Sequence, residues 1–188
     1  MTTQPILIAP YSHEVYHTVT PSSLHEARQI FTSTGAQDAI NTTIRDCFLK
    51  HKVEKQFSAC VNHRHFDIEP NERNIDLAGQ AAASSNLNNI HACSWLFYNG
   101  ALYPYEFKRL PPGQSIAEPP QDFRTDLGHI LEKKGLCDII GLQSYSEGVV
   151  GVESTDHDTR VSTTVDHDES FDPSAHRGKI QMASFAFF

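Results

Sequence analysis

The sequence predicts an α+β fold in which two or three helices pack on one side of a mostly antiparallel sheet. Two aromatic-rich runs, residues 90–98 and 101–107, are joined by Asn99-Gly100, the strongest short-range signal for a β-hairpin with a type I′ turn. Apolar residues recur every three or four positions over residues 36–51 and 121–134, as in amphipathic helices. The chain of 188 residues suits a single domain, residues 1–188.

The first sixty residues contain a predicted edge strand and two predicted helices. A short apolar run at residues 5–10 lies between two prolines, which restrict a strand to the edge of a sheet. Ser23 and Glu26 have the spacing of a capping box, which begins a short helix. A second start signal at residues 34–37 begins a helix that ends near His51. The apolar face of this second helix consists of Ala36, Ile40, Ile44, Cys47 and Phe48.

The middle of the chain predicts a strand, a loop and the hairpin. Residues 57–69 read as a strand that begins apolar and ends in ionisable groups. Residues 70–89 are polar and predict a long loop, with a short helix near 77–83, and such loops often cover sites. The hairpin register pairs Tyr98 with Ala101, Cys93 with Glu106 and His91 with Lys108.

The last third of the chain predicts a linker, one helix and four strands. Prolines exclude helix from residues 110–120, which we expect to be extended. The helix at 121–134 ends at Gly135, the residue that favours a left-handed cap. The predicted strands are residues 136–145, 149–153, 159–165 and 179–188.

The composition argues against nucleic-acid and membrane partners. The chain has 15 Lys and Arg against 23 Asp and Glu, a net charge of −8, and no basic run that could bind phosphates. The four cysteines include no CxxC pair and predict free thiols in a reducing compartment. The first residues lack the features of an export signal, so we expect a cytoplasmic protein.

The strongest chemical candidate lies at the end of the predicted strand 57–69. At period two, His63, His65 and Asp67 share one face, with the two imidazoles about 7 Å apart. Two histidines and a carboxylate can bind a divalent metal or act as an oriented acid and base pair. The alternative is that Asp67 and Arg64 are solvated or paired charges while the histidines form hydrogen bonds in a half-buried rim.

Residues 63–69 also have the HxHxxxE spacing of the first metal motif of cupins, with Glu69 as the acidic member. The resemblance is partial, because Phe57 and Asp76 occupy the places of the flanking glycines. The segment 111–113 is not followed by the expected third histidine. We therefore assign neither a metal ligand nor a cofactor from the sequence.

The hairpin supplies a second candidate. His91, Cys93 and Glu106 would share one face as base, nucleophile and orienting group, although strand neighbours about 7 Å apart are too distant for a direct hydrogen bond. His91 and Glu106 could instead face the same cavity as His63 and His65. Aromatic residues of the hairpin would line an apolar pocket, or form core: Trp95, Tyr103 and Tyr105.

The tripeptide Asp-His-Asp occurs twice, at residues 156–158 and 166–168. Acidic residues around a histidine suit a metal, but each copy follows a predicted strand. The preferred interpretation is therefore a solvated turn.

Two segments carry a resemblance. His63-Arg-His-Phe-Asp-Ile68, followed by Glu69 and Glu72-Arg73, and the run Trp95-Leu-Phe-Tyr-Asn-Gly-Ala-Leu-Tyr-Pro-Tyr-Glu-Phe107 are similar to small intracellular fungal proteins of unassigned function. The similarity covers about residues 57–110 and leaves out the first sixty residues and the Asp-His-Asp repeats. Some such proteins sit beside biosynthetic enzymes, so the resemblance implies chemistry on small metabolites.

The leading hypothesis is a cofactor-independent acid–base enzyme of the lyase, isomerase or cyclase type, acting on a small organic molecule. His63 and His65 would exchange protons, Asp67 would fix a tautomer, and Arg64 or Glu106 would pair with substrate charge. The alternatives are a noncatalytic ligand-binding or homodimeric interaction protein and a histidine-ligated metalloprotein.

Overall fold

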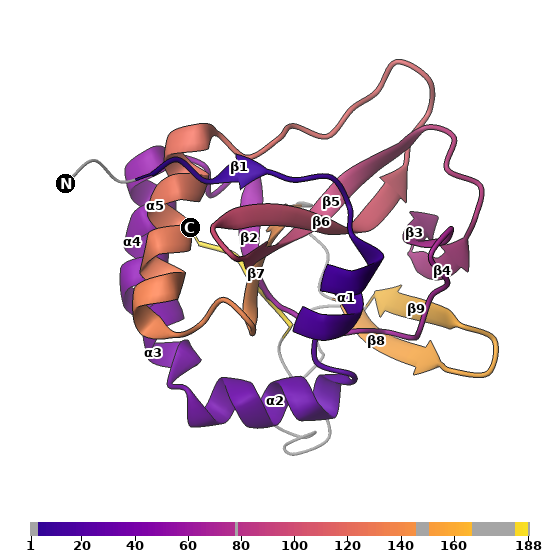
Figure 1. Cartoon of the computed structure of the whole chain (residues 1–188), viewed down its shortest axis with the longest axis horizontal. Coiled ribbons are helices and arrows are strands. Elements are labelled where there is room, and N and C mark those ends of the chain that lie inside the picture. Colours follow the sequence, from indigo (N-terminus) through magenta and orange to yellow (C-terminus); the bar gives the residue numbers. More distant parts are fainter. Residues whose placement is uncertain (1–3, 78, 146–150, 167–182, 188) are drawn as a thin grey trace.

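The computed structural model describes residues 4–77, 79–145, 151–166 and 183–187 (Figure 1). Its strands form one sheet in the order β10-β2-β7-β5-β6-β3-β4-β9-β8, and β1 pairs with β6 outside this path. The pairs β1–β6 and β3–β6 are parallel and the other pairs are antiparallel. The predicted α+β class with a mostly antiparallel sheet is therefore confirmed. Within the described residues, no helix combines the length and the apolar character needed to cross a membrane.

The helices are α1 (His13–Val19), α2 (Leu24–Ser33), α3 (Ala36–Ala39), the π-helix η1 (Ile40–Ile44), α4 (Arg45–His51) and α5 (Gln121–Lys134). The strands in the first half of the chain are β1 (Leu7–Ile8), β2 (Phe57–Val61), β3 (Arg73–Leu77) and β4 (Gln80–Ser84). The later strands are β5 (Ile90–Tyr98), β6 (Ala101–Arg109), β7 (Ile140–Ser144), β8 (Gly151–Asp156), β9 (Val161–Asp166) and β10 (Ser184–Phe185).

Two hydrophobic clusters cover the two faces of the sheet. The larger cluster includes Trp95 and Phe97 of β5 together with apolar residues of α2, α3, η1, α4 and α5. The smaller cluster includes Leu96, whose side chain points to the opposite face because strand residues alternate, and residues of α1. In Figure 1, α4 and α5 lie side by side, whereas α1 lies apart from them. Helix α1 was not predicted, and it covers the face opposite the predicted helices.

Several elements were predicted correctly from local sequence signals. Asn99 and Gly100 both have positive φ, 46° and 73°, as a type I′ turn requires, and Tyr98 pairs with Ala101 as expected. Helix α5 ends at Gly135 with φ 66°, again as expected. The Ser23 side chain caps α2 by accepting from the Glu26 N–H at 3.2 Å.

Two segments differ from the predictions. The strand expected over residues 57–69 ends at Val61, where its ladder with β7 also ends, opposite Ile140. The expected loop at 70–89 contains the strands β3 and β4 instead of a helix. The alanine-rich β4 has little intrinsic preference for a strand, so its pairing with β3 and β9 determines its structure.

Helix α1 holds the chain after β2 in place. The Tyr16 hydroxyl donates to the Phe66 carbonyl at 3.2 Å. His13 and His17 each donate from Nε2 to the Ile68 carbonyl, at 2.8 and 3.1 Å. Since Phe66 and Ile68 are buried against α1, the intervening backbone has a fixed path although it belongs to no strand.

Candidate functional site

His63 and His65 lie in the loop that follows β2, and both are buried, with 9% and 6% of their side chains exposed. Their ring centroids are 4.6 Å apart, closer than strand neighbours would be. The strand geometry used to group them was therefore wrong, although the loop brings the two rings together.

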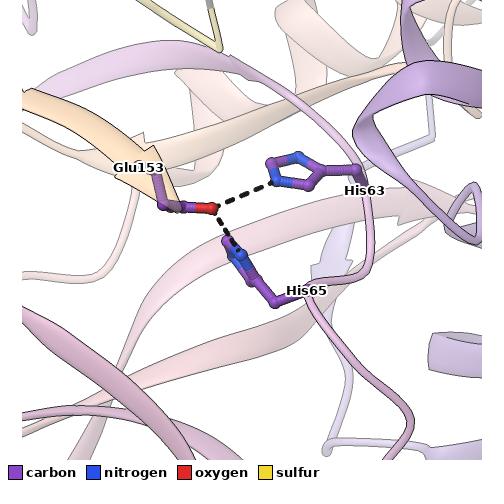
Figure 2. Close-up of side chains that lie close together, drawn as sticks. All are labelled: His63, His65 and Glu153. Atoms are coloured by element: carbon purple, nitrogen blue, oxygen red, sulfur yellow. Dashed lines mark ion pairs between the residues drawn. The ribbon is translucent and has the colours of Figure 1, made fainter. Parts of the chain in front are cut away.

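The third member of the cluster is Glu153 of β8, which the sequence did not indicate (Figure 2). Its Oε1 atom lies 2.7 Å from His65 Nδ1 and 3.8 Å from His63 Nε2. One potential ligand atom from each of the three residues lies within 4.8 Å of the other two. This is a constellation of two imidazoles and one carboxylate, assembled from a loop and a distant strand.

The β8–β9 hairpin that carries Glu153 is attached at two points. Strand β9 pairs with β4, and the hairpin lies at one end of the sheet in Figure 1. Arg160, in the turn between β8 and β9, donates Nη1 and Nη2 to the two carboxylate oxygens of Glu72 at 2.6 and 3.0 Å. This two-point contact joins the hairpin to the segment that follows the histidines, and so fixes where Glu153 lies.

Glu106 of β6 holds the far side of His65. The His65 Nε2 donates to Glu106 Oε1 at 2.7 Å, and the Ser94 hydroxyl donates to Glu106 Oε2 at 2.7 Å. The Asn74 amide adds a longer contact of 3.4 Å. Burial disfavours the charged carboxylate, but the hydrogen bond and charge of His65 outweigh it and lower the pKa of Glu106.

Each histidine has one ring nitrogen bonded away from Glu153. His63 donates from Nδ1 to the Val61 carbonyl at 3.0 Å, so in the neutral ring the lone pair is on Nε2, which faces Glu153. His65 is bonded through Nε2 to Glu106, so its Nδ1 faces Glu153. These outer contacts orient both rings in the way that carboxylates and carbonyls orient metal-binding histidines.

The short contact between His65 and Glu153 needs a positive charge. His65 Nδ1 is buried and lacks a hydrogen bond of acceptable alignment within the described residues, although the carboxylate oxygen is only 2.7 Å away. Two lone pairs at this distance repel each other, so a proton or another cation must neutralise them. In the protonated form, burial opposes the charge, but the hydrogen bond to Glu106 and the charges of Glu106 and Glu153 raise the pKa of His65 to about 10.

A hollow of about 230 Å³ opens beside the three residues. The other residues that line it come from the start of α2, the loop and the β8–β9 hairpin: Ser23, Leu24, Arg64, Thr155 and His157. His157 belongs to the first Asp-His-Asp segment. The Asp156 carboxylate accepts from the Asp158 and Thr159 N–H groups at 2.9 and 3.2 Å, so this segment is a turn as expected. The second copy lies largely outside the described residues.

Asp67 and Arg64 pair with each other, as the alternative interpretation of the sequence expected, and Asp67 does not orient either histidine ring. Arg64 Nη1 donates to Asp67 at 3.0 Å and to His17 Nδ1 at 2.7 Å, and the Asp67 side chain is 83% exposed. Asp67 therefore faces Arg64 and His17 instead of the rings of His63 and His65. Glu69, the acidic residue of the cupin-like spacing, is also exposed and does not belong to the cluster.

The hairpin candidates are buried or half-buried. Trp95 and Tyr105 are buried in the two hydrophobic clusters, and Tyr103 packs beside the second. Like His91, which lies opposite Lys108, these three aromatic residues are not among those that line the hollow. The aromatic residues that were considered for a pocket wall therefore belong to the hydrophobic core or pack against it.

The predicted pairing of Cys93 with Glu106 was wrong. Irregularities in both strands of the hairpin leave Ser94 opposite Glu106, while the pairing of His91 with Lys108 is kept. Burial raises the pKa of the Cys93 thiol, which opposes a role as a nucleophile at neutral pH. Glu106 serves instead as the partner of His65.

Glu153 could not be recognised from the sequence, since it is a single acidic residue at the end of a predicted strand, 90 positions after His63. Comparison of the sequence with protein-family models found no match, and comparisons with curated proteins and with solved structures found none either. The case for a function therefore depends on the geometry described above.

Proposed function

We propose that this chain is a metalloenzyme that binds one zinc or iron(II) ion through His63 Nε2, His65 Nδ1 and the Glu153 carboxylate and acts on a small organic molecule. The observation that carries the proposal is the convergence of these three groups while the second nitrogen of each ring is bonded to a fixed acceptor. Two histidines and one carboxylate are a known ligand set for both metals.

The distances are compatible with an ion. Bonds of about 2.1 Å in tetrahedral geometry separate ligand atoms by about 3.4 Å. The separations in the structure, 2.7 Å from His65 Nδ1 to Glu153 Oε1 and 3.8 Å from His63 Nε2 to Glu153 Oε1, lie on either side of this value. Side-chain shifts of less than about 1 Å would bring both separations to the tetrahedral value.

The charge of the site also favours a divalent cation. Glu106 and Glu153 both have lowered pKa values and are ionised at neutral pH. Without a metal, the proton on His65 balances one of these charges. A divalent ion that replaced this proton would balance both, because His65 would remain bonded to Glu106 as a neutral ligand.

The bound ion would supply Lewis-acid chemistry, polarising an oxygen of the substrate or of a water molecule. The protein would contribute the remaining functions. Glu106 and the Val61 carbonyl orient the two rings, and the hollow beside them offers space for a small ligand. Reactions of the lyase and isomerase type, which remove a proton next to a carbonyl group, are among those that such polarisation assists.

Metal analysis tests the proposal directly. Protein stripped with a chelator and reloaded should bind one zinc or iron(II) ion per chain. The double variant His63→Ala, His65→Ala should bind none at micromolar metal. The control His91→Ala removes a histidine outside the hollow and should bind one ion. Failure of the wild type to bind either metal, or equal binding by the double variant, would show the proposal to be wrong.

A second candidate is the cofactor-independent acid–base enzyme that the sequence suggested. The observation in its favour is that His63 lines the hollow with Nδ1 bonded to the Val61 carbonyl, so that Nε2 of the neutral ring could accept a proton from a substrate. Both nitrogens of His65 face carboxylates, so His63 would act as the base alone. Turnover that survives chelation of the protein but is lost in His63→Gln would favour this candidate over the metalloenzyme.

A further inference from the structure

We infer that the hollow beside His63, His65 and Glu153 binds a small organic acid, with its carboxylate between the metal position and Arg64. The inference rests on the proposed function and assigns the class of ligand. It follows from the charge, the donor groups and the size of the hollow.

Arg64 provides a positive charge that the site does not otherwise use. Glu106 and Glu153 together balance a divalent ion, so neither is left to neutralise the guanidinium. Arg64 Nη1 contacts Asp67 at 3.0 Å and His17 Nδ1 at 2.7 Å, but the Asp67 carboxylate is 83% exposed, so solvent screens its charge. Arg64 lines the hollow, and its Nε atom is buried with no hydrogen-bond partner in the described part of the chain. A planar guanidinium with a spare donor suits a carboxylate.

Apart from the apolar Leu24, the other groups around the hollow that do not bind the metal can donate a hydrogen bond, and none of them carries a negative charge. The Ser23 hydroxyl already accepts from the Glu26 N–H and keeps its own proton for a ligand. From the β8–β9 hairpin, Thr155 supplies a second hydroxyl, which also contacts the Ser162 hydroxyl at 3.1 Å, and His157 supplies a ring nitrogen. Among the described residues that line the hollow, Glu153 is the one carboxylate, and it is assigned to the metal. The wall therefore favours an anionic oxygen ligand over a cationic one.

The size of the hollow limits the ligand. A volume of about 230 Å³ compares with about 30 Å³ for a water molecule in the liquid, which allows about seven or eight groups of that size. Pockets for drug-sized ligands begin at about 300 Å³. The enclosed space therefore suits a short-chain acid.

Acetate and its neutral isostere acetamide separate charge from shape in a direct test. The protein is loaded with cobalt(II), whose visible absorption reports its ligands, and each compound is titrated while the band is followed. Acetate should change the spectrum, whereas acetamide at the same concentration should not. In Arg64→Gln, the dissociation constant for acetate should rise about tenfold or more, because the guanidinium is lost. The cobalt absorption read before acetate is added reports the fraction of metal-loaded protein in each variant.

Two further variants keep the test decisive. Asp67→Asn removes the exposed partner of Arg64 and should bind acetate at least as tightly as the wild type. His157→Ala changes an exposed side chain in a turn, so folding should be unaffected, and acetate binding should weaken about threefold or more for loss of one hydrogen bond. If Arg64→Gln does not fold, the acetate affinity of His157→Ala decides whether the inference holds.

The outcomes distinguish the two proposals. If cobalt does not bind to the wild type, the proposed function is wrong and this inference falls with it. If cobalt binds but acetate binds equally well to the wild type, Arg64→Gln and His157→Ala, only the present inference is wrong. Inorganic phosphate that binds more tightly than acetate would overturn the assignment to carboxylates.

Discussion

Replacing Glu106 by glutamine tests whether this carboxylate orients the His65 ring and stabilises its protonated form. The environment raises the pKa of His65 from 6.5 to about 10, which corresponds to about 5 kcal/mol in favour of the charged ring. Glu106 and Glu153 share this effect, so the loss of Glu106 should lower the free energy of unfolding of the metal-free protein by about 2 kcal/mol. For a chain of this size, that change lowers the unfolding temperature by about 4–8 °C.

Circular dichroism at pH 7 in the presence of a chelator measures the unfolding temperature of Glu106→Gln. Zinc titration of the same variant should show an affinity about 10- to 100-fold weaker than in the wild type, because the ring loses its orienting carboxylate. Asp126→Asn is the matched control. Asp126 accepts from His51 Nε2 at 2.9 Å, but its side chain is 42% exposed, so the variant should lose less than about 1 kcal/mol. If Glu106→Gln unfolds at the wild-type temperature and binds zinc equally well, this account of His65 is wrong.

Three further predictions concern stability and the attachment of the hairpin. Gly128→Ala should lower the free energy of unfolding by about 1–3 kcal/mol in a denaturant titration, because the new methyl group would overlap the Ile6 side chain. Glu72→Gln should weaken zinc binding with little change in the unfolding temperature, since it releases Arg160 and the hairpin that carries Glu153; unchanged affinity would refute this role. The pKa of Glu106 is lowered by folding, so its stabilisation is complete above about pH 4.5 and is lost as the pH falls through the lower folded value. The difference in unfolding temperature between metal-free wild type and Glu106→Gln should therefore shrink below pH 4.5, and a constant difference would contradict the assignment.

The elements that were predicted correctly depend on local chemistry. Asn99-Gly100 can adopt the positive φ angles of its turn whatever surrounds it, and Gly135 ends α5 in the same way. The apolar spacing over residues 36–51 does produce helix, although the π-helix η1 interrupts it at Ile40–Ile44. These features depend on the residues of the segment itself, so the sequence alone was sufficient to predict where they occur.

The site was predicted only in part because it depends on contacts between distant segments. His63 and His65 were identified, but their loop takes its path from α1, through Tyr16 and the histidines that bind the Ile68 carbonyl. Glu153 joins them because β9 pairs with β4, a strand whose alanines gave no local signal. The shift that placed Ser94 opposite Glu106 arises from paired irregularities, which strand alternation alone does not reveal.

The distance along the chain between His63 and Glu153 has a consequence for synthesis on the ribosome. At a translation rate of about 5–20 residues per second, the 90 residues that separate them take about 5–18 s to add. During this interval the nascent chain exposes two neighbouring imidazoles without their carboxylate. Capture of the proposed metal before the hairpin is translated would depend on the histidines alone, and the three proposed ligands can come together only after β8 has left the exit tunnel.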